Sequence, residues 1–168
     1  MRIATFNLES LDLSLQGEAA FQRRAALLAP QLDRLCADVL CLQEVNGQHL
    51  RGQSARKLIA LERLLTDTVY RDFHVFAAGG ASEKPITDVH NLAIVSRWPA
   101  RRTEVLHHRL VPPLSYRSVT ATPAQARELT LTWDRPLLYA VFDLPSGRAL
   151  HVMNLHLRSP LAAPIPGG

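Results

Sequence analysis

Three polar side chains end apolar, strand-like runs of this sequence, and their types suit the binding of a metal ion and a phosphate. Asn7 ends the first run, Glu44 the second and His156 the last. A carboxylate beside an amide oxygen suits a hard divalent cation such as Mg²⁺, which takes oxygen ligands and keeps several waters. An imidazole near a metal-bound phosphate can stabilise developing charge or transfer a proton. These residues predict phosphate chemistry if the fold brings them together.

The elements around Asn7 and Glu44 predict that the two side chains meet. The sequence favours a strand from Arg2 to Leu8, a helix from Glu18 to Leu35 and a strand from Asp38 to Glu44. A strand–helix–strand crossover normally makes its two strands parallel. Parallel strands end at the same edge of a sheet, where the ligand sites of α/β sheets gather. We therefore expect Asn7 and Glu44 to lie side by side.

Two helices are predicted from the spacing of apolar residues. Apolar residues of the 18–35 segment recur at spacings of three and four, which marks one buried face. Pro30 lies inside this pattern and is expected to kink or interrupt the helix, at a cost of about 3 kcal/mol. Ser54 is expected to cap a second helix with Leu58, Leu61 and Leu65 on one side.

The chain after Tyr70 is predicted to be mostly strands. A hairpin turn is expected at Pro145–Gly147, where glycine supplies the unusual backbone angle. Two polar loops, Gly79–His90 and Val111–Trp133, separate the strands. The predicted strands are Phe73–Ala78, Asn91–Ser96, Leu137–Leu144 and Ala149–His156.

Composition indicates one globular domain with a mild preference for anionic partners. The chain has 168 residues, 47% of them hydrophobic and 20% charged, with a formal net charge of +4. Its arginines are scattered and form no basic run, so the charge is not a nucleic-acid signature. Cys36 and Cys41 are predicted to be free core thiols of a reducing compartment. The opening residues do not resemble a signal peptide, and a cytoplasmic location is expected.

Four stretches of the sequence resemble successive motifs of the endonuclease/exonuclease/phosphatase superfamily, whose members include deoxyribonuclease I, sphingomyelinases and inositol-polyphosphate phosphatases. In chain order the stretches are A-T-F-N-L-E (Ala4 to Glu9), L-C-L-Q-E-V (Leu40 to Val45), N-L-A-I-V-S-R-W-P (Asn91 to Pro99) and M-N-L-H-L-R-S (Met153 to Ser159). The resemblance implies an α/β (α+β) fold, the deoxyribonuclease I-like four-layered αββα sandwich. This chain would supply about the first half, one mixed β-sheet with helices on its outer face.

The resemblance also implies roles for individual residues. Glu44 matches the glutamate that holds Mg²⁺ or Mn²⁺, and Asn7 matches an asparagine that organises the metal and phosphate site. His156 resembles a histidine that contacts the scissile phosphate, and Asn91 is a candidate substrate contact. Gln43 and Glu9 are predicted to orient these side chains without contacting the metal or the substrate themselves. The implied reaction is hydrolysis of a phosphodiester or phosphomonoester by metal-assisted attack of water.

Two motifs of the superfamily are not found in the sequence. These are G-D-x-N, whose Asp orients the attacking water, and the C-terminal S-D-H, which holds the principal catalytic histidine. Residues 1–159 are therefore predicted to be the N-terminal part of such a domain, and residues 160–168 a Pro/Gly-rich tail, read as a truncated loop. The phosphoesterase would then need a C-terminal half that this chain lacks.

An alternative to the enzyme stays open, because a half sandwich would leave an apolar sheet face bare. The chain would then be a catalytically inactive fragment or an interaction module, pairing with a second copy or with a complementary C-terminal chain. The substrate also stays open among nucleic acid, phosphoinositides, phospholipid head groups and nucleotides. No role is assigned to His90, Arg117 or Arg135.

Overall fold

The computed structural model describes residues 1–13, 17–50, 52–78, 86–107, 112–117, 128–131 and 135–157. Its two helices are α1 (Glu18–Leu35) and α2 (Ile59–Thr66). Its strands are β1 (Ile3–Leu11), β2 (Val39–Val45), β3 (Gln48–His49), β4 (Arg56–Lys57), β5 (His74–Ala78), β6 (Asn91–Ser96), β7 (Ala100–Leu106), β8 (Leu114–Tyr116), β9 (Leu129–Leu131), β10 (Leu137–Asp143) and β11 (Ala149–Asn154). The predicted tail 160–168 lies outside the described residues, as do Arg158 and Ser159.

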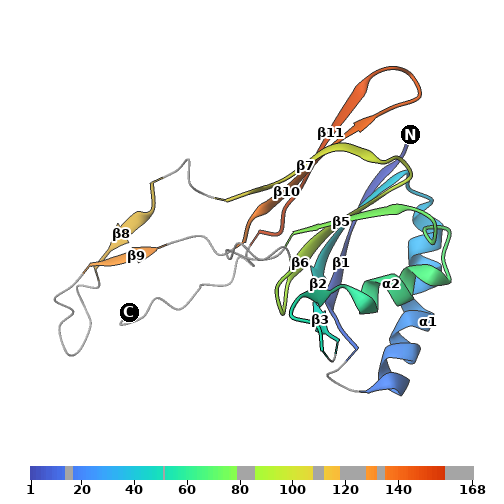
Figure 1. Ribbon diagram of the computed structural model, residues 1–168, viewed down its shortest axis with the longest axis horizontal. Coiled ribbons are helices and arrows are strands. Elements are labelled where there is room, and N and C mark those ends of the chain that lie inside the picture. Colours follow the sequence, from blue (N-terminus) through green and yellow to red (C-terminus); the bar gives the residue numbers. More distant parts are fainter. Residues whose placement is uncertain are drawn as a thin grey trace.

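A mixed four-stranded sheet, ordered β1-β2-β6-β5, forms the centre of the fold. β1 runs parallel to β2, as the sequence predicts, while β6 is antiparallel to both β2 and β5. Both helices lie on one side of this sheet (Figure 1). The core between helices and sheet contains the fully buried side chains of Leu32, Leu42 and Leu61. This half of the structure is the helix-covered sheet that the sequence indicates.

A second sheet, ordered β11-β10-β7 and wholly antiparallel, covers the other face of the first (Figure 1). Val39 and Ile94 of the first sheet pack in one cluster with Ala140 and Phe142 of the second. The predicted fold class is confirmed, with layers of helices, sheet and sheet. The expectation of a bare inner sheet face is wrong, because the later strands of the chain cover it.

Several local predictions are corrected. Pro30 does not interrupt α1, which runs through it from Glu18 to Leu35. Ser54 does not cap α2, whose N-cap residue is Leu58 without a side-chain cap bond. Cys36 is exposed at the end of α1, whereas Cys41 is buried as predicted, and both are free thiols. The region predicted as one loop, Val111–Trp133, contains the short strands β8 and β9.

Further differences concern the second sheet. β7 was not predicted, because four of the seven residues of Ala100–Leu106 are exposed, two of them arginines, and the sequence shows no apolar alternation. The hairpin between β10 and β11 forms as predicted, with Gly147 at φ 78° and its N–H donating to Leu144 O at 2.9 Å. Among the described residues, neither helix combines the length and the hydropathy that a bilayer crossing demands.

One buried asparagine joins the two sheets. Asn154, at the end of β11, donates through Nδ2 to Leu42 O at 2.8 Å and to Ala93 O at 2.9 Å. These carbonyls belong to β2 and β6, next to the point where the pairing of these strands shifts register. Its Oδ1 accepts from Gln43 Nε2 at 2.7 Å. Asn154 therefore fixes the end of β11 above β2, two residues before His156.

Replacing this residue tests the connection. Asn154→Leu keeps the approximate volume but leaves two buried carbonyls and the Gln43 amide without their partner, each loss costing about 1–3 kcal/mol. We expect the free energy of unfolding in urea to fall by about 3 kcal/mol or more. Met153→Leu, at a 58% exposed neighbour, is the control and should change it by less than about 0.5 kcal/mol. Equal stability of both variants would contradict the assignment.

Candidate active site

Asn7 and Glu44 lie in contact at one edge of the first sheet. Nδ2 of Asn7 donates to Oε1 of Glu44 at 3.2 Å. Oδ1 of Asn7 accepts the backbone N–H of Glu9 at 2.8 Å, which fixes the orientation of the amide. The predicted proximity of Asn7 and Glu44 is confirmed, whereas their catalytic and metal-binding roles remain predictions.

Both strands depart from regular geometry at this level. The β1–β2 register shifts between Asn7 and Leu11, where Glu9 and Ser10 have φ values of 48° and 58°. Glu44 itself has φ 59°, in the left-handed region that a residue with a side chain rarely adopts. Bulges of this kind redirect a side chain at the end of a strand and are frequent next to functional sites. The local strain is therefore concentrated where Glu44 leaves the sheet.

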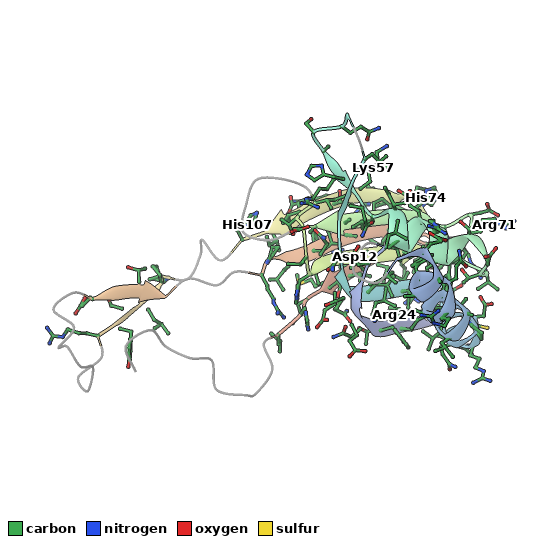
Figure 2. All side chains as sticks on the ribbon, turned by 90° about the horizontal axis from the view of Figure 1, so that it is seen from below. Asp12, Arg24, Lys57, Arg71, His74 and His107 are labelled. Atoms are coloured by element: carbon green, nitrogen blue, oxygen red, sulfur yellow. The ribbon has the colours of Figure 1, made fainter. Side chains whose placement is uncertain are left out.

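Neighbouring groups hold the bulge of β1 in place. Arg24 of α1 donates through NH2 to the carbonyl oxygens of Leu8 and Glu9. Ser10 Oγ donates to Oε2 of Glu44 at 3.4 Å. A pocket of about 410 Å³ opens beside the bulge and is bounded in part by Ser10, Asp12 and Arg24, the last two labelled in Figure 2. Ser10 thus both bounds this pocket and contacts the carboxylate of Glu44.

Glu44 is ionised in this setting. Its side chain is 18% exposed, and burial by itself would raise the pKa of the carboxyl group. The hydrogen bond from Asn7 and the nearby rings of His156 and His90 act in the opposite direction and outweigh burial, so the pKa lies below its ordinary value. A carboxylate that keeps its charge while partly desolvated is suited to a cation.

His156 approaches the same carboxylate from the second sheet. Its Nε2 lies 3.4 Å from Oε1 of Glu44, and its Nδ1 lies 2.9 Å from NH1 of Arg135. A guanidinium only donates, so Nδ1 accepts and the proton of the neutral ring resides on Nε2. Burial, followed by the charge of Arg135, lowers the pKa of His156. The ring is therefore a neutral N–H donor facing the site.

His90 is a further member of the site, one that the sequence did not identify. One of its ring nitrogens lies within 4.8 Å of both a carboxylate oxygen of Glu44 and a ring nitrogen of His156. His90 has φ 61°, and its Nδ1 is buried with no hydrogen-bond partner among the described residues. The only signal in the sequence was its place directly before the Asn91–Ser96 motif.

Buried amides hold His90 in this conformation. Asn46, only 1% exposed, accepts the His90 N–H through Oδ1 at 3.2 Å and donates to Asp12 Oδ2 at 3.1 Å. Asn91 is fully buried and donates to Val45 O at 2.7 Å, while its Oδ1 accepts the Thr87 N–H at 2.7 Å. These bonds tie the loop before β6 to the end of β2, where Glu44 lies.

The other predicted site residues lie further from the carboxylate. Gln43 points between the sheets, where it bonds Thr5 Oγ1 at 3.0 Å as well as Asn154. Glu9 is exposed, and Asn91 is enclosed by main-chain groups. The predicted substrate contact of Asn91 and the supporting roles of Gln43 and Glu9 remain predictions.

The donor set fits a divalent metal ion. Glu44 offers an ionised carboxylate and His90 a ring nitrogen without a hydrogen-bond partner among the described residues, while Asn7 holds the carboxylate through its Nδ2. Carboxylate, carbonyl and imidazole groups are the usual protein ligands of divalent ions. The charge of Glu44 and the unfilled bonding capacity of His90 are both features that a bound cation would satisfy.

Two solved structures share this architecture. One is an endonuclease/exonuclease/phosphatase family protein from Leptotrichia buccalis C-1013-b, with a TM-score of 0.56 and 15% sequence identity over 96% of this chain and 56% of that chain. The other is humanized D. rerio TDP2 with 14 mutations, with a TM-score of 0.51 and 19% identity over 95% of this chain and 48% of that chain. The chain has the fold of the endonuclease/exonuclease/phosphatase superfamily.

The resemblance predicted from the sequence motifs is therefore confirmed at the level of the fold. The chain spans about half the length of these two proteins. No model of a protein family matches the sequence, and no curated protein does.

The hold on His90 can be tested at Asn46. Asn46→Ala leaves the His90 N–H and one oxygen of Asp12 without this partner, so we expect the free energy of unfolding to fall by about 2 kcal/mol. Hydrogen exchange of the His90 amide should also become faster, because its acceptor is gone. Gln53→Ala, at an exposed position, serves as the control. Unchanged exchange at His90 would contradict the role of Asn46.

Proposed function

We propose that this chain supplies part of the active site of a divalent-metal-dependent phosphoesterase, with Asn7, Glu44 and His156 as its catalytic residues. The observation that carries the proposal is the meeting of three chain segments at one carboxylate. Glu44 Oε1 is 3.2 Å from Asn7 Nδ2 and 3.4 Å from His156 Nε2. The superfamily fold supports the proposal, since the four sequence stretches that resemble superfamily motifs begin on β1, β2, β6 and β11.

Each residue has a role that its contacts suit. Glu44, with Asn7 beside it, would hold Mg²⁺ or Mn²⁺, an ion that neutralises charge on phosphate oxygens and on the leaving oxygen. Asn7 orients the carboxylate by donating one hydrogen bond to it. His156 presents Nε2–H to a non-bridging phosphate oxygen, where an aimed donor stabilises developing negative charge.

Arg135 keeps His156 in the form that this role requires. Because its guanidinium donates to Nδ1 at 2.9 Å, the proton stays on Nε2, the nitrogen that faces Glu44. The lowered pKa keeps the ring neutral, so it is a donor without forming a permanent ion pair with Glu44. The positive charge of Arg135 also favours an anionic substrate at this place.

The substrate is proposed to be a phosphodiester or phosphomonoester, with nucleic acid as one candidate. Residues 1–159 would form the N-terminal part of the catalytic domain. The groups that orient the attacking water would come from a C-terminal half, in keeping with the length of the two solved structures.

Substitution of the central carboxylate tests the function. In the full-length protein, Glu44→Gln removes the charge but keeps the shape, and we expect Mg²⁺- or Mn²⁺-dependent hydrolysis of bis(p-nitrophenyl) phosphate to fall by roughly a thousandfold. Glu62→Gln, at an exposed position of α2, should retain full turnover. The turnover of the two variants is compared after urea unfolding has shown that their midpoints are equal. Normal turnover by the Glu44 variant would refute the proposal.

A second candidate function is an interaction module that pairs with another chain. It is favoured by the edge strand β11 and the residues after it, where Met153 is 58%, Leu155 40% and Leu157 73% exposed. Exposed apolar side chains along an unpaired strand edge are typical of a surface that another strand covers.

Light scattering of the 168-residue chain tests pairing. Self-association through β11 predicts a dimer mass that reverts to a monomer mass in Met153→Lys, because a charge opposes edge pairing. Val89→Lys, at another exposed apolar position, should remain dimeric. A monomer at high concentration would contradict pairing with a second copy.

A further inference from the structure

We infer that His90 is a metal ligand, so that the ion bound by Glu44 also has a nitrogen ligand and His156 remains a hydrogen-bond donor beside it. The inference concerns the site of the proposed function and rests on that proposal only for what the ion would do in a reaction. It assigns different tasks to two histidines that lie near the same carboxylate.

The first argument is the unfilled bonding capacity of His90. A ring nitrogen lies within 4.8 Å of a carboxylate oxygen of Glu44, and Nδ1 is buried without a partner among the described residues. A buried polar atom left unpaired costs about 1–3 kcal/mol. A bound cation that takes Nδ1 as a ligand would relieve this cost. Two ligand atoms of one ion lie up to about 4.2 Å apart, so only a small movement is needed.

The second argument is the backbone. His90 and Glu44 both adopt left-handed angles, φ 61° and 59°, and neither is a glycine. Such conformations are disfavoured and persist only where surrounding structure enforces them. The buried amides of Asn46 and Asn91 hold the neighbouring backbone through their hydrogen bonds to His90 N–H, Val45 O and Thr87 N–H. The strain at both residues has the effect of directing their side chains to the same point.

The third argument separates the two histidines. Nδ1 of His156 already accepts from Arg135 at 2.9 Å, so its Nε2 carries the proton of the neutral ring and has no lone pair for a metal. His90 has no such partner among the described residues. The lone pair that a metal requires is therefore available on His90 and occupied by a proton on His156.

A mixed nitrogen and oxygen site has a consequence for the choice of ion. Mg²⁺ prefers oxygen ligands, whereas imidazole suits transition metals such as Zn²⁺. Mn²⁺ accepts both oxygen and nitrogen ligands. A site that includes an imidazole therefore binds Mn²⁺ more tightly than Mg²⁺. We therefore expect the chain to bind Mn²⁺ more tightly than Mg²⁺, and His90 to be the cause of the difference.

Electron paramagnetic resonance with Mn²⁺ as the only added ion tests the inference. Pulsed spectra of the bound ion should show nitrogen modulation from a coordinated imidazole in the wild-type protein. His90→Asn should remove the modulation and weaken Mn²⁺ binding by at least about tenfold. Loss of a residue that only hydrogen-bonds a metal ligand already weakens metal binding by about this factor. Asparagine is chosen because it tolerates left-handed backbone angles. Mg²⁺ affinity, measured by competition, should change little.

Two matched variants complete the experiment. His156→Asn should keep the nitrogen modulation, and His74→Asn, at an exposed histidine of β5, controls for adventitious binding. Absence of modulation in the wild type, its persistence in His90→Asn, or its loss in His156→Asn would each overturn the inference. If His90→Asn does not fold, the histidines of the wild-type protein are labelled with ¹⁵N instead. The label should change the nitrogen modulation, and an unchanged signal would overturn the inference.

The outcome is separable from that of the proposed function. Suppose that the nitrogen modulation depends on His90 but the full-length protein hydrolyses no phosphoester. This result would support His90 as a metal ligand and refute the proposed phosphoesterase function. Hydrolysis that depends on Glu44 but is unaffected in His90→Asn, together with an absence of nitrogen modulation, would support the phosphoesterase and overturn the assignment of His90 as a ligand. Weakened binding of inorganic phosphate with unchanged Mn²⁺ binding in His90→Asn would make the ring a phosphate contact and overturn the inference.

Discussion

The hydrogen bonds of Asn154 are the constraint on which the site depends. They join β11 to β2 and β6 where the pairing of those strands is irregular, and they satisfy two buried carbonyls that a regular ladder would otherwise pair. Because His156 follows two residues later, its distance from Glu44 is determined by this contact and by the bond to Gln43. Two sheets that pack through apolar side chains could slide past each other, and a buried, directional amide contact prevents it.

At this end of the sheet, hydrogen bonds of buried amides offset the strain of unfavourable backbone angles. The left-handed angles at Glu44 and His90 are unfavourable, while the buried amide of Asn46 bonds the His90 N–H and that of Asn91 bonds Val45 O, directly after Glu44. The result is a carboxylate with a lowered pKa beside two imidazoles, one with both nitrogens engaged and one with an unpaired nitrogen among the described residues. Such an arrangement is chemically suited to a divalent cation.

Much of the fold and part of the site could be predicted from the sequence. The spacing of apolar residues gave α1 with its observed ends, and the crossover rule placed Asn7 beside Glu44. Signals of this kind are local or follow from chain order. His90 could not be predicted, because its position depends on a left-handed residue and on side-chain bonds from Asn46, which lies 44 residues away. The contact of Arg135 with His156 was missed for a similar reason, since it depends on how β10 and β11 pair. β7 was missed because its half-exposed, arginine-containing sequence lacks the apolar alternation that marks a strand.

The central claim is that Glu44 and its neighbours bind a divalent cation where a phosphate can reach it. A crystal structure determined with Mn²⁺, using anomalous scattering to locate the ion, tests this most directly. The account predicts one strong peak at coordination distance from the carboxylate of Glu44, with Asn7 and His156 still beside it. A map at saturating Mn²⁺ with no peak there, and with Glu44 bonded only to Asn7 and His156, would contradict it.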